Sequence, residues 1–92
     1  MNDQRHLIFS EQNAHYDSSR YIVLFSGKEG SKIVKCGISK EALEDYFQGN
    51  GKNPVKVFQV NHKNIEHKAR RKYLAGESEP DGSILLKTKD FG

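Results

Sequence analysis

Residues 21–25 have the sequence YIVLF, the longest apolar run in the chain. Aromatic and β-branched residues without intervening polar ones are typical of a strand that is covered on both faces. This stretch therefore predicts a central strand. A glycine-bearing turn at 27–31 follows it, and residues 32–38 then alternate between apolar and polar, which predicts a second, half-buried strand.

The flanking segments complete a small set of elements. Leu7-Ile8-Phe9 predicts a short first strand, and the polar residues 11–19 predict a connecting loop. Ser39 is a suitable N-cap for a short helix over residues 40–48, which the Gly49-Asn50-Gly51 stretch ends.

A second helix is predicted over residues 54–75. Asn53 followed by Pro54 is a helix-start pattern, and Gly76 marks the end of the helix. Residues 83–88 then predict the last strand.

The order strand-strand-strand-helix-helix-strand predicts an α+β fold. We expect one domain over residues 1–92, because this length leaves no room for a second core. Its antiparallel sheet would have about four strands, with two helices packed on one face. The last strand must pair with an earlier one, because a lone strand leaves its backbone hydrogen-bonding groups unsatisfied.

One face of the second helix carries apolar residues at helical spacing. They fall within about 80° of one another around the helix axis, and we expect this face to pack on the sheet. Its members are Val55, Phe58, His62, Ile65, Ala69 and Tyr73. Val57, Val60 and Leu74 lie off this face. They would form a protein contact if exposed, or pack under the first helix or the last strand.

The net charge of +3 is concentrated on the same helix. Between Pro54 and Gly76 there are six Lys or Arg residues against the single acid Glu66, whereas residues 1–53 are neutral and residues 77–92 carry −2. Five basic side chains lie opposite the apolar face: Lys56, Lys63, His67, Arg70 and Arg71.

Two interpretations of this basic face remain open. It could dock an anionic partner, with nucleic acid as the first candidate. It could instead be the solvated side of an amphipathic helix, as such charge runs usually are, with its cations complementing the negative helix C-terminus. The sequence has no zinc-finger spacing, ribonucleoprotein aromatic motif or Gly-x-x-Gly clamp to favour the first.

The sequence predicts no catalytic residue, no cofactor and no metal site. His62 lies at the edge of the apolar face, and His67 is about 140° further round the helix, so the two cannot chelate one ion. Cys36 shares a strand face with Val34 and Ile38, which favours an inert buried thiol over a reactive one near a helix N-terminus. We therefore expect that the protein is not an enzyme.

The chain has no apolar run long enough to cross a bilayer, and its N-terminus has no signal-peptide core. With one cysteine no internal disulfide can form, so we expect a cytoplasmic protein.

A set of residues spread from Ile8 to Phe91 resembles the pattern of a known family. The set includes Ile8-Phe9-Ser10, Tyr16-Asp17, Phe25, Cys36-Gly37-Ile38-Ser39, Ala42-Leu43, Phe47, Phe58, Asn61, Ile65-Glu66, Ala69, Asp81-Gly82 and Asp90-Phe91. In order and spacing it is similar to the small bacterial family called domain of unknown function 1488. The resemblance implies a small cytoplasmic α+β protein. It implies no activity and no catalytic residues.

Three functional hypotheses follow. The first is a non-catalytic binding module whose basic second helix contacts an anionic partner such as nucleic acid. The second is a protein-interaction or homo-oligomeric module, for example a homodimer, that uses an exposed sheet edge or Val57, Val60 and Leu74. The third and weakest is an enzyme with a site built from Tyr16, Asp17 and Cys36.

Overall fold

The framework of the fold is a long antiparallel hairpin of β2 (Ile22–Glu29) and β3 (Lys32–Ser39). It is seen in a computed structural model that describes residues 7–9 and 14–91. Only Gly30 and Ser31 connect the strands, because Glu29 pairs with Lys32. Gly30 has φ +63°, a left-handed conformation that glycine adopts without steric penalty. The two-residue turn thus fixes the register of the hairpin.

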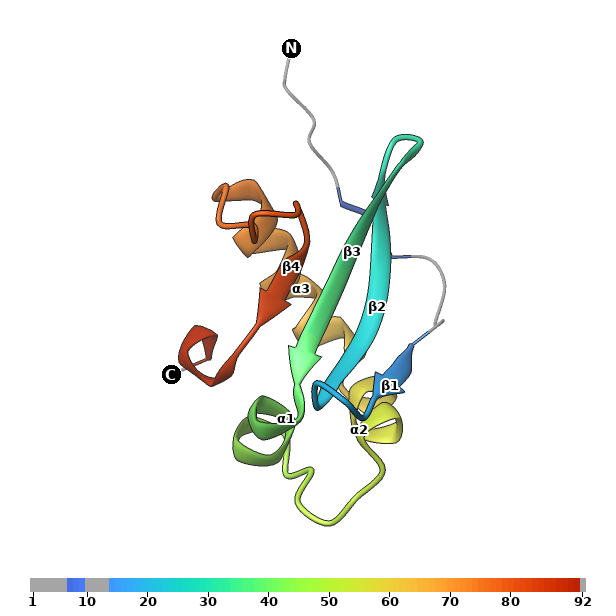
Figure 1. Cartoon of the computed structure of the whole chain (residues 1–92), viewed down its shortest axis with the longest axis vertical. Coiled ribbons are helices and arrows are strands. Elements are labelled where there is room, and N and C mark those ends of the chain that lie inside the picture. Colours follow the sequence, from blue (N-terminus) through green and yellow to red (C-terminus); the bar gives the residue numbers. More distant parts are fainter. Residues whose placement is uncertain (1–6, 10–13, 92) are drawn as a thin grey trace.

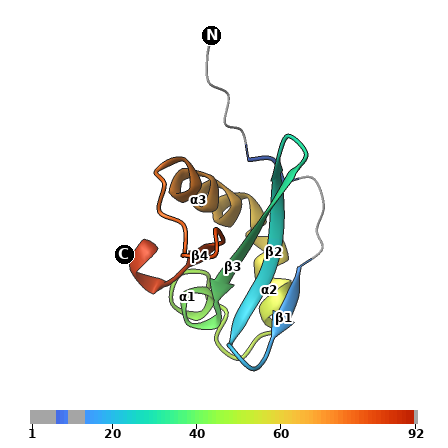
Figure 2. The ribbon, with the colours of Figure 1, turned by 45° about the horizontal axis from the view of Figure 1, so that its top comes forward.

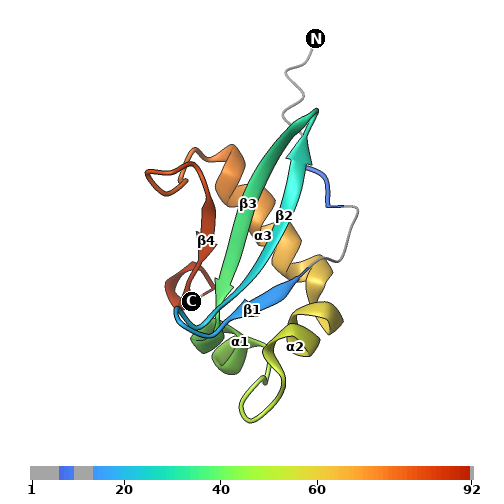
Figure 3. The same ribbon diagram turned by 45° about the vertical axis from the view of Figure 1, so that its right-hand side comes forward.

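This register assigns alternate side chains to opposite faces of the sheet. The inner face carries the apolar residues that meet the helices: Val23, Phe25, Val34, Cys36 and Ile38. The outer face carries Ile22, Leu24 and Gly37, and no helix crosses it in the described part of the chain (Figure 3). The predicted central position of 21–25 is confirmed for β2, which lies between β1 and β3.

The sheet has the strand order β1-β2-β3-β4, with β1 (His15–Asp17) at one edge and β4 (Ile84–Leu86) at the other (Figure 1). The predicted return of the last strand beside an earlier one is confirmed. However, β4 pairs with β3 in parallel, so the prediction of an antiparallel sheet is wrong at this pair. The reason is that the intervening helices carry the chain back along the sheet, and β4 therefore runs in the direction of β3.

The first strand is not where the sequence predicts it. β1 lies at His15–Asp17, inside the segment predicted as a loop, of which residues 11–13 lie outside the described residues. Leu7-Ile8-Phe9 forms only one bridge, in which the backbone groups of Ile8 and Lys28 exchange two hydrogen bonds of 2.9 Å. The apolar residues of this segment reflect burial and not a strand. The Leu7 side chain is fully buried in the core, although the segment has no continuous ladder of backbone hydrogen bonds.

The first two helices begin at their predicted caps. Ser39 Oγ accepts a 3.1 Å hydrogen bond from the Ala42 N–H at the start of α1 (Lys40–Tyr46). Asn53 Oδ1 accepts bonds from the Val55 and Lys56 N–H groups at the start of α2 (Pro54–Val60). These side chains satisfy backbone donors that the first helical turn leaves free.

The prediction of a single second helix over residues 54–75 is wrong. It is broken at Asn61 into α2 and α3 (His62–Leu74), so the described part of the chain has three α-helices, not two (Figure 2). Asn61 has φ −110° and ψ 17°, outside the α-helical range, and its Nδ2 donates to the Val57 carbonyl at 2.9 Å. An asparagine side chain that bonds to the backbone in this way competes with regular helix formation.

The break changes which residues reach the core. Val57, predicted to lie off the apolar face, is buried with Phe58, whereas Val55 is only half-buried. In α3 the predicted face is correct, and Ile65, Ala69 and Tyr73 are buried. Val60 is 75% exposed and Leu74 is also exposed.

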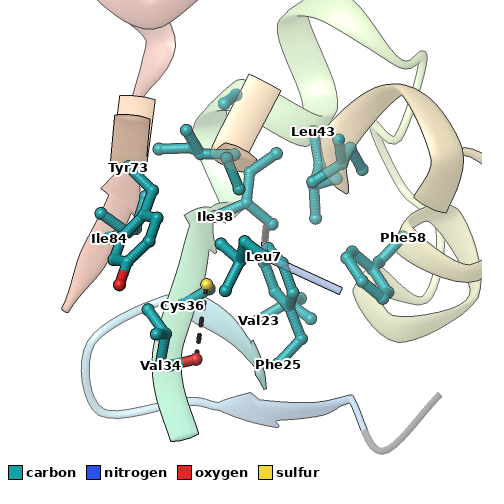
Figure 4. Packing of buried hydrophobic residues seen from close by; sticks show 14 of the residues in the cluster. Leu7, Val23, Phe25, Val34, Cys36, Ile38, Leu43, Phe58, Tyr73 and Ile84 are labelled. Atoms are coloured by element: carbon teal, nitrogen blue, oxygen red, sulfur yellow. Dashed lines mark hydrogen bonds between the residues drawn. The ribbon is translucent and has the colours of Figure 1, made fainter. Parts of the chain in front are cut away.

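The core lies between the inner face of the sheet and the three helices (Figure 4). Its largest fully buried side chain is Phe58, whose ring lies 4.6 Å from that of Phe25, centroid to centroid. Tilted aromatic pairs at this distance are favourable beyond the area that they bury. This contact attaches α2 to the central strand.

We predict that Phe58→Ala lowers the free energy of unfolding by about 3–5 kcal/mol, because it leaves a cavity against Phe25. Urea denaturation followed by circular dichroism measures the loss. The exposed Val60 in the same helix is the control, and Val60→Ala should change the free energy by less than about 0.5 kcal/mol. Equal effects of the two substitutions would contradict this placement of α2.

Candidate functional site

Four of the five predicted basic residues are exposed, and we call this set the basic stripe: Lys56, Lys63, His67 and Arg71. The last three recur every four residues along α3, so they lie on successive turns of one helix face, and Lys56 precedes them on α2. This face of α3 points away from the buried face formed by Ile65 and Ala69. Among the described residues, none of the four makes an ion pair.

Arg70, the fifth predicted residue, has a structural contact instead. Its Nε donates a 2.8 Å hydrogen bond to the Leu7 carbonyl, and its guanidinium carbon lies 5.5 Å from the centre of the Phe9 ring. Arg70 therefore holds the N-terminal segment against α3. The sequence could not show this, because the two partners are more than sixty residues apart.

Two further cations of α3 are also bound within the protein. Lys72 Nζ donates to the Leu85 carbonyl at 2.8 Å and to Asp90 Oδ2 at 3.0 Å. Burial alone would raise the pKa of Asp90, but hydrogen bonds from the Lys87 backbone and from Lys72 outweigh it and lower that pKa. Lys68 Nζ lies 5.7 Å from the centre of the Phe91 ring. These contacts attach the C-terminal residues to α3.

The only acid of α2 and α3 is turned away from the basic stripe. Glu66 is 8% exposed, and its Oε2 lies 3.2 Å from Nδ1 of His62. His62 is half-buried, in agreement with its predicted place at the edge of the apolar face. The basic stripe consequently has no carboxylate of its own helices beside it.

The residues of the hypothetical enzyme site are not brought together. Tyr16 and Cys36 lie on the inner side of the sheet, while Asp17 is on the outer side. Asp17 accepts hydrogen bonds from Ser19 and Arg20, which lower its pKa. The structure therefore gives no geometric support to a site made of these three.

The Cys36 thiol is buried, as predicted, and lies 3.7 Å from the Val34 carbonyl oxygen (Figure 4). Burial raises its pKa to about 12, and the negative charge of Glu66 adds to the effect. Among residues 7–9 and 14–91, no three His, Cys, Asp or Glu side chains form a group that could hold a metal ion. In the same ranges no helix combines the length and the apolar character that a membrane span requires.

A second surface was not recognised from the sequence as a site. Ile22 and Leu24 of β2 and Leu85 of β4 surround Gly37 on the outer face of the sheet, and we call these four residues the outer patch. Ile22, Leu24 and Leu85 line a depression of about 680 Å³, which Ile33, Lys35 and the loop before β4 also border. The sequence does carry a signal for this surface. Residues 21–25 are apolar at every position, which predicts a strand that is covered on both faces.

The fold is a small α+β domain with exposed cations on its helices and a sheet face that no helix crosses in the described part of the chain. Its sequence matches the family model described as "Protein of unknown function (DUF1488)" over residues 7–86. The chain therefore belongs to the DUF1488 family, which confirms the resemblance found in the sequence.

A crystal structure of a protein of unknown function from the same family, from Shewanella loihica PV-4, is similar to this chain. The TM-score is 0.78 at 18% sequence identity, over 92% of this chain and 96% of the other. At this identity the likeness shows a shared fold. No curated protein matches the sequence.

We predict that Arg70→Ala and Arg71→Ala differ in stability although the residues are adjacent. Loss of the Arg70 hydrogen bond leaves the Leu7 carbonyl unpaired and should lower the free energy of unfolding by about 1.5–3 kcal/mol. Arg71 is exposed, so Arg71→Ala should lower the free energy of unfolding by less than about 1 kcal/mol. Urea denaturation of both variants checks the difference, and equal stabilities would contradict the structural role of Arg70.

We predict that Cys36 reacts slowly with a thiol reagent in the native protein and quickly in denaturant. With a pKa of about 12, the folded protein holds almost no thiolate at pH 8, whereas an unfolded cysteine has a pKa near 8.5. The release of thionitrobenzoate from Ellman's reagent measures both rates. Rapid stoichiometric labelling of the native protein would show that the thiol is accessible and reactive.

Proposed function

We propose that the basic stripe docks an anionic partner and that this partner is nucleic acid. The observation that supports the proposal is that the cations of α2 and α3 fall into two groups. Lys68, Arg70 and Lys72 have partners within the protein, whereas the four members of the basic stripe are exposed and without ion pairs among the described residues.

The spacing of the basic stripe suits a phosphate backbone. Lys63 and Arg71 are eight residues apart, which corresponds to about 12 Å along a helix axis. Duplex DNA carries one negative charge per about 1.7 Å of its axis, so several phosphates lie within that span. Lysine and arginine contacts of this kind position a protein on nucleic acid without selecting a sequence. We therefore expect binding that is independent of sequence.

The salt dependence of duplex binding tests this proposal. If Lys56, Lys63 and Arg71 each contact a phosphate, the three contacts give a log–log slope of about −2.7. Lys63→Glu combined with Arg71→Glu should weaken binding and reduce the slope to about −0.9. Fluorescence anisotropy with a labelled duplex of mixed sequence measures both slopes. Titrations should begin at low salt, because affinity near physiological salt would be only about 10⁻⁴–10⁻⁶ M.

Lys28→Glu combined with Lys35→Glu is the matched control. Both lysines are exposed on the hairpin, and the change in net charge is the same as in the stripe variant. The control should keep the wild-type slope. If both double variants lose binding equally, the effect comes from net charge and not from the basic stripe. If the wild-type protein does not bind at low salt, the basic stripe is a solvated helix face.

A further inference from the structure

The loop that joins α1 to α2 contains the dipeptide Asn50-Gly51 (Figure 1). Both residues are exposed. The Lys52 N–H donates a 2.9 Å hydrogen bond to the Gly49 carbonyl, so residues 49–52 form a β-turn. Gly51 is the third residue of this turn and has φ +76°, which identifies the turn as type II.

An asparagine that precedes a glycine can react with its own main chain. The main-chain nitrogen of the glycine attacks the side-chain carbonyl carbon of the asparagine, and a five-membered imide ring closes as ammonia leaves. The attack requires a nitrogen that is not held in a hydrogen bond, and it is fastest when the second residue has no side chain in the way. These requirements can be checked residue by residue in the structure.

The turn leaves the attacking nitrogen available. Among the described residues, the Gly51 N–H has no hydrogen-bond partner, and the Asn50 side chain has none either. A Cβ atom at Gly51 would meet no heavy atom within 4 Å, so the peptide between the two residues has room to rotate. This rotation is needed to bring the nitrogen to the Asn50 side chain, and it strains the turn. We therefore expect the folded protein to react more slowly than the unfolded chain.

The other asparagines that the structure describes do not meet the requirements. Asn53 precedes Pro54, whose nitrogen has no hydrogen to lose. The Asn61 amide nitrogen donates to a main-chain carbonyl of α2. Asn64 precedes Ile65, whose N–H donates to the Asn61 carbonyl at 3.2 Å. Asn50 is thus distinguished from all three by its surroundings.

The Asp81-Gly82 pair gives the sharpest comparison, because an aspartate can close the same ring with loss of water. Asp81 Oδ1 accepts hydrogen bonds from the Ser83 hydroxyl at 2.7 Å and from the Ser83 N–H at 2.9 Å, and both lower the pKa of Asp81. The Gly82 N–H donates to the Glu79 carbonyl at 2.8 Å. Both reacting groups of this second pair are therefore held in hydrogen bonds.

We propose that Asn50 is a site of spontaneous deamidation. The Gly51 nitrogen gives its proton to the solvent and forms a bond to Cγ of Asn50. The bond from Cγ to Nδ2 breaks, and this nitrogen takes a proton from the solvent and leaves as ammonia. Water then opens the imide at either of its carbonyl carbons, which yields aspartate or isoaspartate. Nothing is oxidised or reduced, and water is the only co-reactant.

The modification changes both charge and chain length at the connection between α1 and α2. One carboxylate replaces a neutral amide, so the net charge of +3 falls by one. In isoaspartate the main chain runs through the side-chain carbon, and the loop becomes one methylene longer. The proposal does not depend on the function proposed for the basic stripe.

Incubation of the full-length protein at mildly alkaline pH tests the proposal. Trypsin releases residues 41–52 as one peptide, in which Asn50 is the only asparagine. Mass spectrometry should detect its aspartyl and isoaspartyl forms, at a rate that rises with pH because the attacking nitrogen must lose a proton. Asn50→Gln should give no modified peptide in the same time, because the longer side chain closes a larger ring. A sample taken at time zero measures any reaction during digestion.

Asp81→Asn is the matched comparison, because it places a second asparagine before a glycine in the same exposed type of loop. In the folded variant this position should react about tenfold more slowly than Asn50, since the hydrogen bond from Gly82 to Glu79 must break first. In denaturant the two positions should react at similar rates, because no structure then distinguishes them.

Two results would overturn the proposal. One is a folded protein whose 41–52 peptide stays unmodified while the denatured chain reacts, which would show that the turn protects Asn50. The other is an equal rate at both positions of the folded Asp81→Asn variant, which would show that the free Gly51 N–H does not select the site. Thermal unfolding of both variants confirms that they are folded during the incubation.

Discussion

The register between β2 and β3 is the constraint on which the rest of the structure depends. A slip of one residue would move every side chain of the hairpin to the opposite face. The two-residue turn at Gly30 and Ser31 prevents it, and Val23 and Phe25 consequently face the helices with Cys36 and Ile38 opposite them. The same register places Ile22, Leu24 and Gly37 on the outer face. The turn therefore determines both which hairpin residues enter the core and which form the outer patch.

The break at Asn61 is the second feature that organises the molecule. It lets α2 present Val57 and Phe58 to the core while α3 presents Ile65, Ala69 and Tyr73. The orientation of α3 that follows from this break also divides its cations into two groups. Lys68, Arg70 and Lys72 contact the N- and C-terminal segments, and the remainder face outward. The charge excess of the helices therefore serves the fold in part and leaves a smaller exposed surface than the sequence indicates.

The basic stripe and the outer patch lie on opposite sides of the domain, because α3 packs behind the sheet (Figures 1 and 2). Occupation of one surface leaves the other accessible.

The sequence by itself determined the α+β class, the central strand, the starts of α1 and α2 and the burial of Cys36, because these depend on local periodicity and capping side chains. It also located the cations of the basic stripe. Only the tertiary structure decided the parallel pairing of β4, the position of β1, the break at Asn61 and the contact of Arg70 with Leu7. These depend on partners distant in the chain, and in a three-residue strand such as β1 the local pattern is too short to specify pairing. The outer patch likewise emerges only when β2, β3 and β4 are adjacent, since its apolar floor comes from three strands that meet over one glycine.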